Sequence, residues 1–576
     1  MPDNALDKGL IDYHERSKHR LGRYAPGPGA LDWANQPDPF RTFEGAPRIG
    51  LPLAAGKLAT RYDDLRAGSL PPPARIDLES VAILFELAFG LSAWKSFGGN
   101  RWALRCNPSS GNLHPTEAYL LCAPMEGLPG GLYHYVSRDH ALEQRAPVAG
   151  PDRGLLVGVS SIHWREAWKY GMRAWRYCQH DCGHAIAAVA YAAAALGWQA
   201  RMVSSVSDDV LAGLLGLDRA GDFDDAEAEA PDALLWIGDP EAPPDVEGLR
   251  TAMREATWQG RANRLSAAHV EWPDIEAIHR ATVKPATQEI GSRPIAAMAA
   301  AGMTRAAAEA AAGMTRGAEA AAGMTRGAEA AAGMTRGAEA AAGMTRAAAN
   351  AAAGMPFADL ARQRRSAVDF DATTSIEAKA FFAMLECLLP RAGTPPWNAM
   401  PSPAQVHPVF MVHRVDGLEP GLYILMRDPS ALASLKAAMR PEWLWLKVGP
   451  EHLPLFLLLP HDLREVARVI CCHQDIAADS CFALGMLAHF AAAESEPWRY
   501  RHLFWECGML GHVLYLESEA AGIRGTGIGC FFDDEMHALL GLSDREWQSL
   551  YHFTAGGPVD DPRLSTLPPY EHLRHV

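Results

Sequence analysis

The chain has 576 residues, of which 48% are hydrophobic and 21% are charged, and its formal net charge is −15. One hydrophobic core does not keep growing to this size, so two domains are expected, and the apolar content excludes general disorder. The acidic balance argues against a surface for nucleic acid or an anionic membrane, because such a body repels phosphate at long range.

The N-terminal residues and the cysteines favour a cytoplasmic protein. The first ten residues contain no basic region followed by an apolar core, and the longest apolar stretches, such as 185–198, are too short to span a bilayer. Ten cysteines in so long a chain do not form a disulfide framework, and we expect them to be reduced. Cys471, Cys472, His473 and Cys481 form the one cluster that resembles a metal site. It lacks a paired Cys-x2-Cys, so no metal is expected.

Predicted elements follow the same order on both sides of a central repeat. On the first side a basic segment with a serine precedes an apolar helix over 80–93, a Pro/Ser loop, two strands, a long helix pair and a closing strand over 233–238. On the second side the helix is expected over 376–389 and the closing strand over 550–556. This order predicts an α+β fold.

The central repeat, residues 298–354, carries the phrase GMTRGAEAAA at a spacing of ten or eleven residues. Alanine favours helix, but one or two glycines per repeat each cost roughly 1 kcal/mol, so we expect a frayed, semi-stiff spacer. A solenoid is excluded because the repeats have almost no bulky apolar side chains to stack. Residues 256–297 contain Trp258, Trp272, Ile275 and Ile278 and are expected to pack as an arm.

Internal similarity indicates a duplication. An ordered series of phrases recurs at offsets of 290, 293 and 325 residues, which chance does not explain. The matching pairs are PSSGNLHP (108–115) with PSPAQVHP (401–408), Gly-Leu-Tyr at 131–133 and 421–423, Arg176-x4-Asp181-Cys182-Gly183 with Arg501-x4-Glu506-Cys507-Gly508, and LAGLLGL (211–217) with MHALLGL (536–542). We therefore expect a first domain over 1–255, an arm over 256–297, a linker over 298–354 and a second, related domain over 355–576.

No Gly-rich dinucleotide motif, Walker loop, nucleophile elbow or metal-binding helix occurs. Small-residue loops and isolated basic residues remain, and they suit a cofactor whose own ring performs the chemistry. One such loop could approach a planar ring closely and hydrogen-bond its polar edge, or could be an ordinary turn; it consists of Asn107, Pro108, Ser109, Ser110, Gly111 and Asn112.

Two further segments have the character of a site. Arg364, Arg365 and Ser366 precede a predicted helix and could clamp a phosphate, or could be a solvated basic pair; residues 16–19 correspond to them in the first half. Residues 525–529 contain alternating glycines, whose N–H groups could line one edge of a ligand, whereas their counterpart, 199–205, contains no glycine.

Lys169 and Tyr170 lie among aromatic and basic residues, where a shifted pKa would let them move protons. The alternative is a surface or interface cluster.

These residues resemble the FMN-dependent nitroreductase superfamily and, within it, the SagB/ThcOx-type dehydrogenases, which include azoline oxidases. The resemblance is carried by RCNPSSGNLHPTEAYLL (105–121), KYGMRAWRYCQHDCGH (169–184), RQRRSAVDF (362–370) and WECGMLGHVLYLESEAAGIRGTGIGCFFDDEMHALLGL (505–542). It implies two tandem nitroreductase-like α+β sandwich domains that form an intramolecular pseudo-dimer with FMN between them.

The resemblance also implies roles for individual residues. Arg364, Arg365 and Ser366 would contact the flavin phosphate and ribityl chain. Gly525, Thr526, Gly527 and Gly529 would lie along the isoalloxazine edge, residues 108–112 would come from the facing half, and Lys169 and Tyr170 would transfer protons. The family's phosphate phrase ends in another basic residue where this chain has Val368, so a substitute is needed.

The resemblance therefore implies an FMN-dependent oxidoreductase that moves hydride between flavin and a small-molecule or peptide-derived substrate, with NAD(P)H as a candidate reductant. The alternative is a non-catalytic, flavin-binding or flavin-free subunit of a peptide-modification complex. Because the second composite groove, built from 16–19, 199–205 and PSPAQ, has lost the family's phrases, one FMN per chain is expected.

Overall fold

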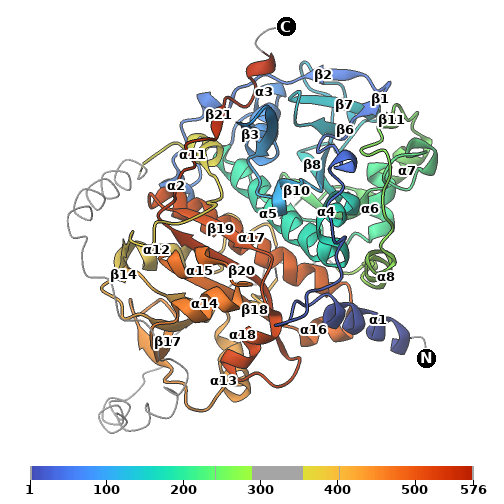
Figure 1. Cartoon of the computed structure of the whole chain (residues 1–576). Helices are drawn as coiled ribbons and strands as arrows, with labels where there is room; N and C mark the ends of the chain where they lie inside the picture. The colour runs from blue at the N-terminus through green and yellow to red at the C-terminus, as the bar shows by residue number, and fades with distance from the viewer. Residues whose placement is uncertain (1–2, 240–241, 289–353, 401, 574–576) are drawn as a thin grey trace.

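The computed structural model describes residues 3–239, 242–288, 354–400 and 402–573. Two large antiparallel sheets lie on either side of a pair of long helices, α5 (Ala174–Ala195) and α17 (Arg499–Ala520) (Figure 1). The fold is α+β, as the sequence predicts. Apart from Gly354, the predicted linker over 298–354 lies outside the described residues.

The two sheets share one strand order. The first is β2-β7-β6-β5-β8-β10-β9 and the second is β16-β17-β15-β13-β18-β20-β19. From the third position onward the strands also correspond in chain order, so the duplicated phrases reflect a duplicated architecture. The strands of the first sheet are β2 (Arg48–Gly50), β5 (Thr116–Cys122), β6 (Gly131–Val136), β7 (Ala141–Ala146), β8 (Leu155–Ser161), β9 (Ala200–Met202) and β10 (Ala230–Ile237). Those of the second are β13 (Val406–Val412), β15 (Gly421–Leu425), β16 (Leu446–Val448), β17 (Leu455–Pro460), β18 (Phe482–His489), β19 (Arg524–Ile528) and β20 (Trp547–Gly556).

The central strands of both sheets are buried on both faces. Every residue of β5, β8, β13 and β20 is buried. Besides α5 and α17, the described helices are α1 (Asp3–Arg16), α2 (Tyr62–Arg66), α3 (Leu78–Ala88), α4 (His163–Tyr170), α6 (Asp208–Leu215), α7 (Val246–Glu255), α8 (Pro273–Ala281), α11 (Phe357–Gln363), α12 (Ala378–Leu388), α13 (Leu432–Ala438), α14 (Arg464–Ile470), α15 (Asp475–Asp479), α16 (Ala491–Ser495) and α18 (Asp533–Leu540).

Helices α5 and α17 cross at a pair of glycines. A Cβ on Gly183 would lie 2.2 Å from the carbonyl oxygen of Trp505, and a Cβ on Gly508 would lie 2.2 Å from that of His180. Only glycine permits this approach of the two backbones. Gly183 and Gly508 are equivalent in the duplication, so the crossing relates the two halves symmetrically.

Two buried ion pairs repeat this symmetry. Arg176 of the first half pairs with Asp533 of the second at 2.7 Å, and Arg501 of the second half pairs with Asp208 of the first at 2.9 Å. Both members of each pair are offset by 325 residues from their equivalents. Each half therefore contributes the arginine of one pair and the aspartate of the other.

The ends of the chain cross between the halves. His14 in α1 is hydrogen-bonded to Tyr500 at 2.9 Å and to Gln548 at 2.8 Å, both in the second half. Near the C-terminus, β21 (Ser565–Leu567) pairs with β3 (Leu91–Phe97) of the first half, beside α3 in Figure 1. The halves are therefore tied together by segments from both ends.

The predicted helix over 80–93 is too long at its C-terminal end. Helix α3 ends at Ala88, and β3 then forms a hairpin with β4 (Asn100–Arg105). The turn contains Gly98 and Gly99, both with positive φ, which is the conformation that short hairpin turns require. The Gly-Gly pair signalled this hairpin, which the sequence interpretation missed.

The arm after residue 255 packs as expected in its described part. Ile275 and Ile278 of α8 are 3% and 1% exposed, in the core that α5 also joins. Two short ladders complete the secondary structure: β1 (Phe43–Glu44) with β11 (Arg261–Ala262), and β12 (Ile376–Glu377) with β14 (Val415–Asp416). Across the described ranges, no helix has the length and apolar character needed to cross a membrane.

Candidate functional site

A cavity of about 890 Å³ lies between the halves. Its walls include most of the residues that the sequence singled out, brought together from four distant segments. Those lining it are Pro108, Ser109, Ser110, Gly111, Asn112, Tyr170, Arg364, Arg365, Ser366, Thr526, Gly527 and Gly529. Lys169 and Gly525 lie just behind the wall.

Residues 108–112 form a turn that is braced by its own polar groups. The Asn112 amide donates to the carbonyl of Ala103 at 2.8 Å, and the Ser109 hydroxyl accepts the His114 N–H at 2.8 Å. Gly111 has a φ of +58°, and a Cβ there would lie 2.4 Å from the Tyr170 hydroxyl. The hydroxyls and amide expected to face a ligand are thus used to shape the turn, and glycine is required for its conformation.

Asn107, the first residue of the predicted loop, also lines the cavity. Its side chain is 1% exposed, and its Oδ1 has no hydrogen-bond partner within the described residues. An unpartnered buried carbonyl is costly and calls for a ligand donor.

Arg364 and Arg365 enter the cavity as two cations without acidic partners. Arg364 donates only to the carbonyls of Arg105 and Cys106, and Arg365 only to backbone carbonyls and the Ser92 hydroxyl. No carboxylate in the described part of the chain forms an ion pair with either. Burial, reinforced by Arg364, lowers the pKa of Arg365 to about 10. Two adjacent, desolvated guanidiniums favour an anionic ligand.

Val368, which replaces the expected third basic residue, is 72% exposed at the rim. Lys95 of β3 lines the same cavity, and its pKa is lowered by burial and then by Arg365. A lysine from the first half therefore brings to the cavity wall a positive charge that the second half lacks.

The glycines at 525, 527 and 529, the first two in β19 and the third directly after it, have a packing role. A Cβ on Gly525, Gly527 or Gly529 would lie 2.4, 1.9 or 2.5 Å from Phe553, Tyr551 or Tyr177, respectively. None of the three has a positive φ. The Gly527 N–H donates to the Tyr515 hydroxyl at 2.9 Å, which also bonds the Ser366 hydroxyl at 2.9 Å. The glycines let aromatic rings lie flat beneath the strand that forms the cavity wall.

Tyr170 faces the loop from the end of α4. Burial, followed by the charge of Glu166, raises its pKa well above the usual value, so the phenol keeps its proton at neutral pH. The Lys169 ammonium lies 5.2 Å from the centre of the Tyr170 ring. Glu166 is fully buried and its two carboxyl oxygens have no partner among the described residues; burial raises its pKa strongly.

Asp181 and Glu506 occupy equivalent places and differ in charge compensation. Asp181 accepts the Ser110 N–H at 3.1 Å, and Glu506 accepts the Gln405 N–H at 3.0 Å. Glu506 also forms a buried ion pair with Arg427, whereas no cation in the described ranges pairs with Asp181. Burial accordingly raises the pKa of Asp181 from 3.8 to about 7.

This difference predicts opposite effects of two matched amide substitutions. The folded protein binds a proton at Asp181 more tightly than the unfolded chain does, so this group costs stability as pH rises from about 4 to about 7. Asp181→Asn should therefore be more stable than the parent above pH 7, by up to about 4 kcal/mol, with the gain vanishing below pH 4. Glu506→Gln should be less stable, because it leaves Arg427 buried without its counter-charge. Urea unfolding across this pH range measures both, and a pH-independent effect of Asp181→Asn would refute the assignment.

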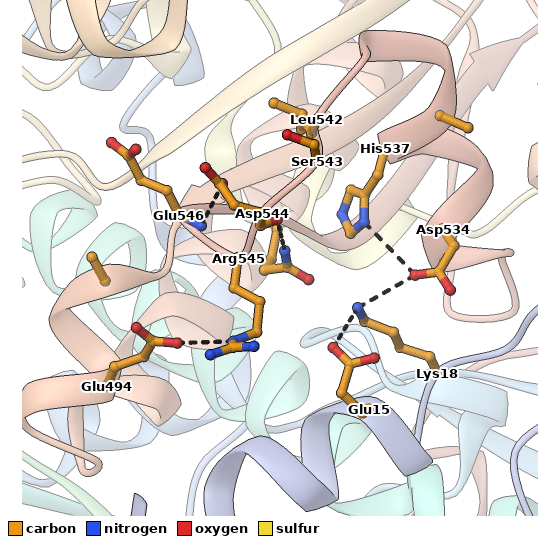
Figure 2. A pocket seen from close by; sticks show the side chains of 13 residues that line it. Glu15, Lys18, Glu494, Asp534, His537, Leu542, Ser543, Asp544, Arg545 and Glu546 are labelled. Atoms are coloured by element: carbon orange, nitrogen blue, oxygen red, sulfur yellow. Dashed lines mark hydrogen bonds and ion pairs between the residues drawn. The ribbon is translucent and has the colours of Figure 1, made fainter. Parts of the chain in front are cut away.

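A second cavity of about 780 Å³ lies beside α1 and α18 (Figure 2). Its charged side chains pair with one another: Lys18 with Glu15 at 2.8 Å and with Asp534 at 3.3 Å, and Arg545 with Glu494 at 3.0 Å. These cations are neutralised, in contrast to Arg364 and Arg365, so an anionic ligand gains little here.

At the place equivalent to the main cavity, a backbone hydrogen bond joins the two segments that would line a second groove. The N–H of Met202, in the strand that corresponds to β19, donates to the carbonyl of Ala399 at 2.8 Å. The loop that precedes β13 therefore lies directly against the strand. Arg16, in the segment equivalent to the arginine pair, forms ion pairs with Asp12 at 3.2 Å and Asp274 at 2.7 Å.

Among solved structures, one from Anabaena variabilis assigned as a nitroreductase matches with a TM-score of 0.62 at 19% identity. The match covers 96% of this chain and 99% of that one, so it extends over both sheets. This chain has the nitroreductase fold. Neither the protein-family models nor the curated proteins contain a match.

Shorter structures match one part of this fold. One from Ralstonia eutropha, also assigned as a nitroreductase, covers 38% of this chain and 97% of its own, with 19% identity and a TM-score of 0.24. A chain of the Escherichia coli microcin synthetase McbBCD complex with truncated pro-MccB17 covers 41% of this chain and 94% of its own, with 18% identity and a TM-score of 0.24.

Proposed function

We propose that the main cavity binds FMN and that the chain is an FMN-dependent oxidoreductase of the nitroreductase kind. The observation that carries the proposal is the arginine pair: Arg364 and Arg365 bring two uncompensated positive charges to the wall of a cavity that also holds the unpartnered Asn107 carbonyl. The cavity volume is within the range of sites for ligands of this size.

The residues present fit the group from its phosphate to its ring. Arg364, Arg365 and Ser366 would hold the phosphate and ribityl end, with Lys95 supplying the third positive charge. Gly527 and Gly529 would line the ring edge beside Thr526, and Gly525 would support that strand from behind. When bound, the flavin supplies hydride transfer, and the protein supplies binding, orientation and proton delivery.

The halves act in this proposal as an intramolecular pseudo-dimer. Loop 108–112 and Tyr170 come from the first half, and the arginine pair and β19 come from the second. The reciprocal pairs Arg176–Asp533 and Arg501–Asp208 support this reading. In a twofold homodimer the same arginine–aspartate pair occurs twice, once in each direction across the interface. We further propose the domain limits 1–255 and 355–576 and a cytoplasmic location.

One FMN per chain is proposed, in the main cavity. In the equivalent groove, Asp12, Asp274 and neighbouring acids neutralise the cations. The Met202–Ala399 hydrogen bond also joins two segments that would have to separate to admit a flavin. A second flavin would have to break these contacts.

Tyr170 is proposed as the proton donor to the substrate, with Lys169 beside it. Tyr170→Phe should lower kcat about a hundredfold, the scale of a lost general acid, and leave FMN affinity unchanged. Tyr133→Phe is the matched control. Tyr133 lies in β6, does not line the cavity, and donates its hydroxyl to the Pro129 carbonyl. If both variants keep the parental kcat, Tyr170 is not the donor.

Turnover tests the activity directly. FMN-loaded chain is mixed with NADPH and a nitroaromatic, a quinone or an enone, and in the opposite direction a thiazoline-containing peptide is offered with oxygen. Turnover of any of these at the expense of bound flavin supports the proposal. A chain that stays colourless in excess FMN supports the alternative, a flavin-free subunit of a peptide-modification complex.

A further inference from the structure

Cys472 and Cys530 are set apart from the other cysteines by their exposure. All ten cysteines are free thiols; eight are buried, and these two are half-buried. Cys472 follows α14, and Cys530 follows β19 and lines the main cavity. The two least buried thiols of the chain are also neighbours, because the Gln474 side chain bridges the loops that carry them.

Gln474 holds the two cysteine loops side by side. Its side-chain amide donates to the carbonyl of Cys471 at 2.7 Å and to the carbonyl of Cys530 at 3.0 Å. The Phe532 N–H also donates to the carbonyl of Ile470 at 2.7 Å. The proximity of the two thiols is therefore supported by backbone anchors on both sides.

His19, from the first half, orients the Cys530 sulfur. Its Nδ1 accepts the Ala25 N–H at 2.9 Å, so the proton of the neutral ring resides on Nε2, which is free to donate to Cys530. Its backbone N–H is held by Asp533 at 3.0 Å. The pKa of Cys530 is lowered to about 5, first by the hydrogen bond from Cys472, with His19 and Arg173 adding to the effect against burial.

These groups do not form a metal site. No cluster of three or more His, Cys, Asp or Glu side chains within the described ranges could hold a metal ion. The sequence grouped Cys471 and Cys481 with Cys472, but both contact other groups. The Cys471 sulfur lies 3.9 Å from His552 Nδ1, and the Cys481 thiol donates to the Thr374 carbonyl at 3.2 Å.

The backbone at Cys472 is held in an uncommon conformation. Cys472 and the following His473 have φ values of +56° and +60°, in the left-handed region that costs non-glycine residues energy.

We propose that Cys472 and Cys530 are a redox-active dithiol, which exchanges with low-molecular-weight disulfides at the wall of the cavity. The Cys530 thiolate attacks one sulfur of the disulfide; that S–S bond breaks, and one small thiolate leaves and is protonated. Cys472 then gives up its proton and attacks the Cys530 sulfur of the mixed disulfide, which releases the second small thiol. Two protein thiols are oxidised to one disulfide, and one small disulfide is reduced to two thiols. This exchange does not depend on flavin.

Oxidised glutathione is the test reagent, with full-length protein that has been reduced and freed of reductant. The expected product has lost two hydrogens, and peptide mapping links Cys472 to Cys530. In Cys472→Ser the reaction should stop at a mixed disulfide, so one glutathione stays on Cys530. Cys471→Ser is the matched control, since its thiol is buried one residue away, and it should still form the internal disulfide.

Substitutions of His19 test whether this side chain positions the Cys530 sulfur. His19→Ala should slow glutathionylation of Cys530 in the Cys472→Ser background by about tenfold, because less of the sulfur is thiolate, and His19→Gln, which restores an N–H donor, should recover part of the rate. Protein that keeps both thiols free in oxidised glutathione overturns the proposal. So does glutathione attached separately to both cysteines of the parent chain without an internal disulfide.

Discussion

Replacing Arg364 and Arg365 together by glutamine is expected to weaken FMN binding by about a thousandfold. Each charge-assisted hydrogen bond to phosphate contributes about 2 kcal/mol, and two of them correspond to three powers of ten in Kd. Neither arginine forms an ion pair in the described part of the chain, so the substitution leaves no acidic partner unpaired. Titration of FMN fluorescence against the purified variant measures the change.

Arg362→Gln is the control for this variant. Arg362 lies in the same segment, but its guanidinium pairs with Asp359 at 2.8 Å and with Glu86 at 3.5 Å and does not line the cavity. Its affinity for FMN should equal that of the parent. Equal affinity of the double variant and the parent would show that the phosphate binds elsewhere.

Gly183→Ala is expected to lower the free energy of unfolding by about 3 kcal/mol, the upper end of the usual cost of overpacking. The added methyl would lie 2.2 Å from the Trp505 carbonyl oxygen, and backbone at a helix crossing cannot turn away as a side chain can. Gly508→Ala should cost about as much, because its methyl meets the His180 carbonyl oxygen at the same distance.

Gly213→Ala is the matched control for the crossing. This glycine lies within α6, and its nearest neighbour would be the Asp218 carboxylate at 3.7 Å. Alanine there should be neutral or stabilising by up to about 1 kcal/mol, because it is the better helix former. Urea unfolding compares the three variants. If Gly183→Ala unfolds at the same urea concentration as Gly213→Ala, the helices do not cross as closely as described.

The repeated phrases were enough to predict the duplicated fold, because each phrase marks a position with one physical requirement. Gly183 and Gly508 recur because two backbones meet there, and Asp208 and Asp533 recur because each neutralises a buried arginine of the other half. The crossings of the chain ends were not predictable in this way. Strand β21 pairs with β3, and no local pattern records such a distant partner.

The sequence predicted which segments contribute to the candidate site better than it predicted what each of their residues does there. The sequence named the segments that line the cavity, but the polar side chains of the loop bond other protein groups: Ser109 the His114 N–H, Ser110 the Asp181 carboxylate of α5 and Asn112 the Ala103 carbonyl. The glycines at 525, 527 and 529 make room for aromatic rings. Lys95 was missed because its position across the interface exists only in the folded chain. The missing hydrogen-bond partner of the Asn107 carbonyl is likewise a property of the folded chain.

Flavin content per chain tests the central claim most directly. Full-length protein is saturated with FMN, freed of unbound cofactor by gel filtration, and assayed for flavin and for protein. The arginine pair in one groove and the neutralised cations in the other predict a ratio near one. A ratio near zero or near two would contradict the proposal that each chain binds one FMN between its halves.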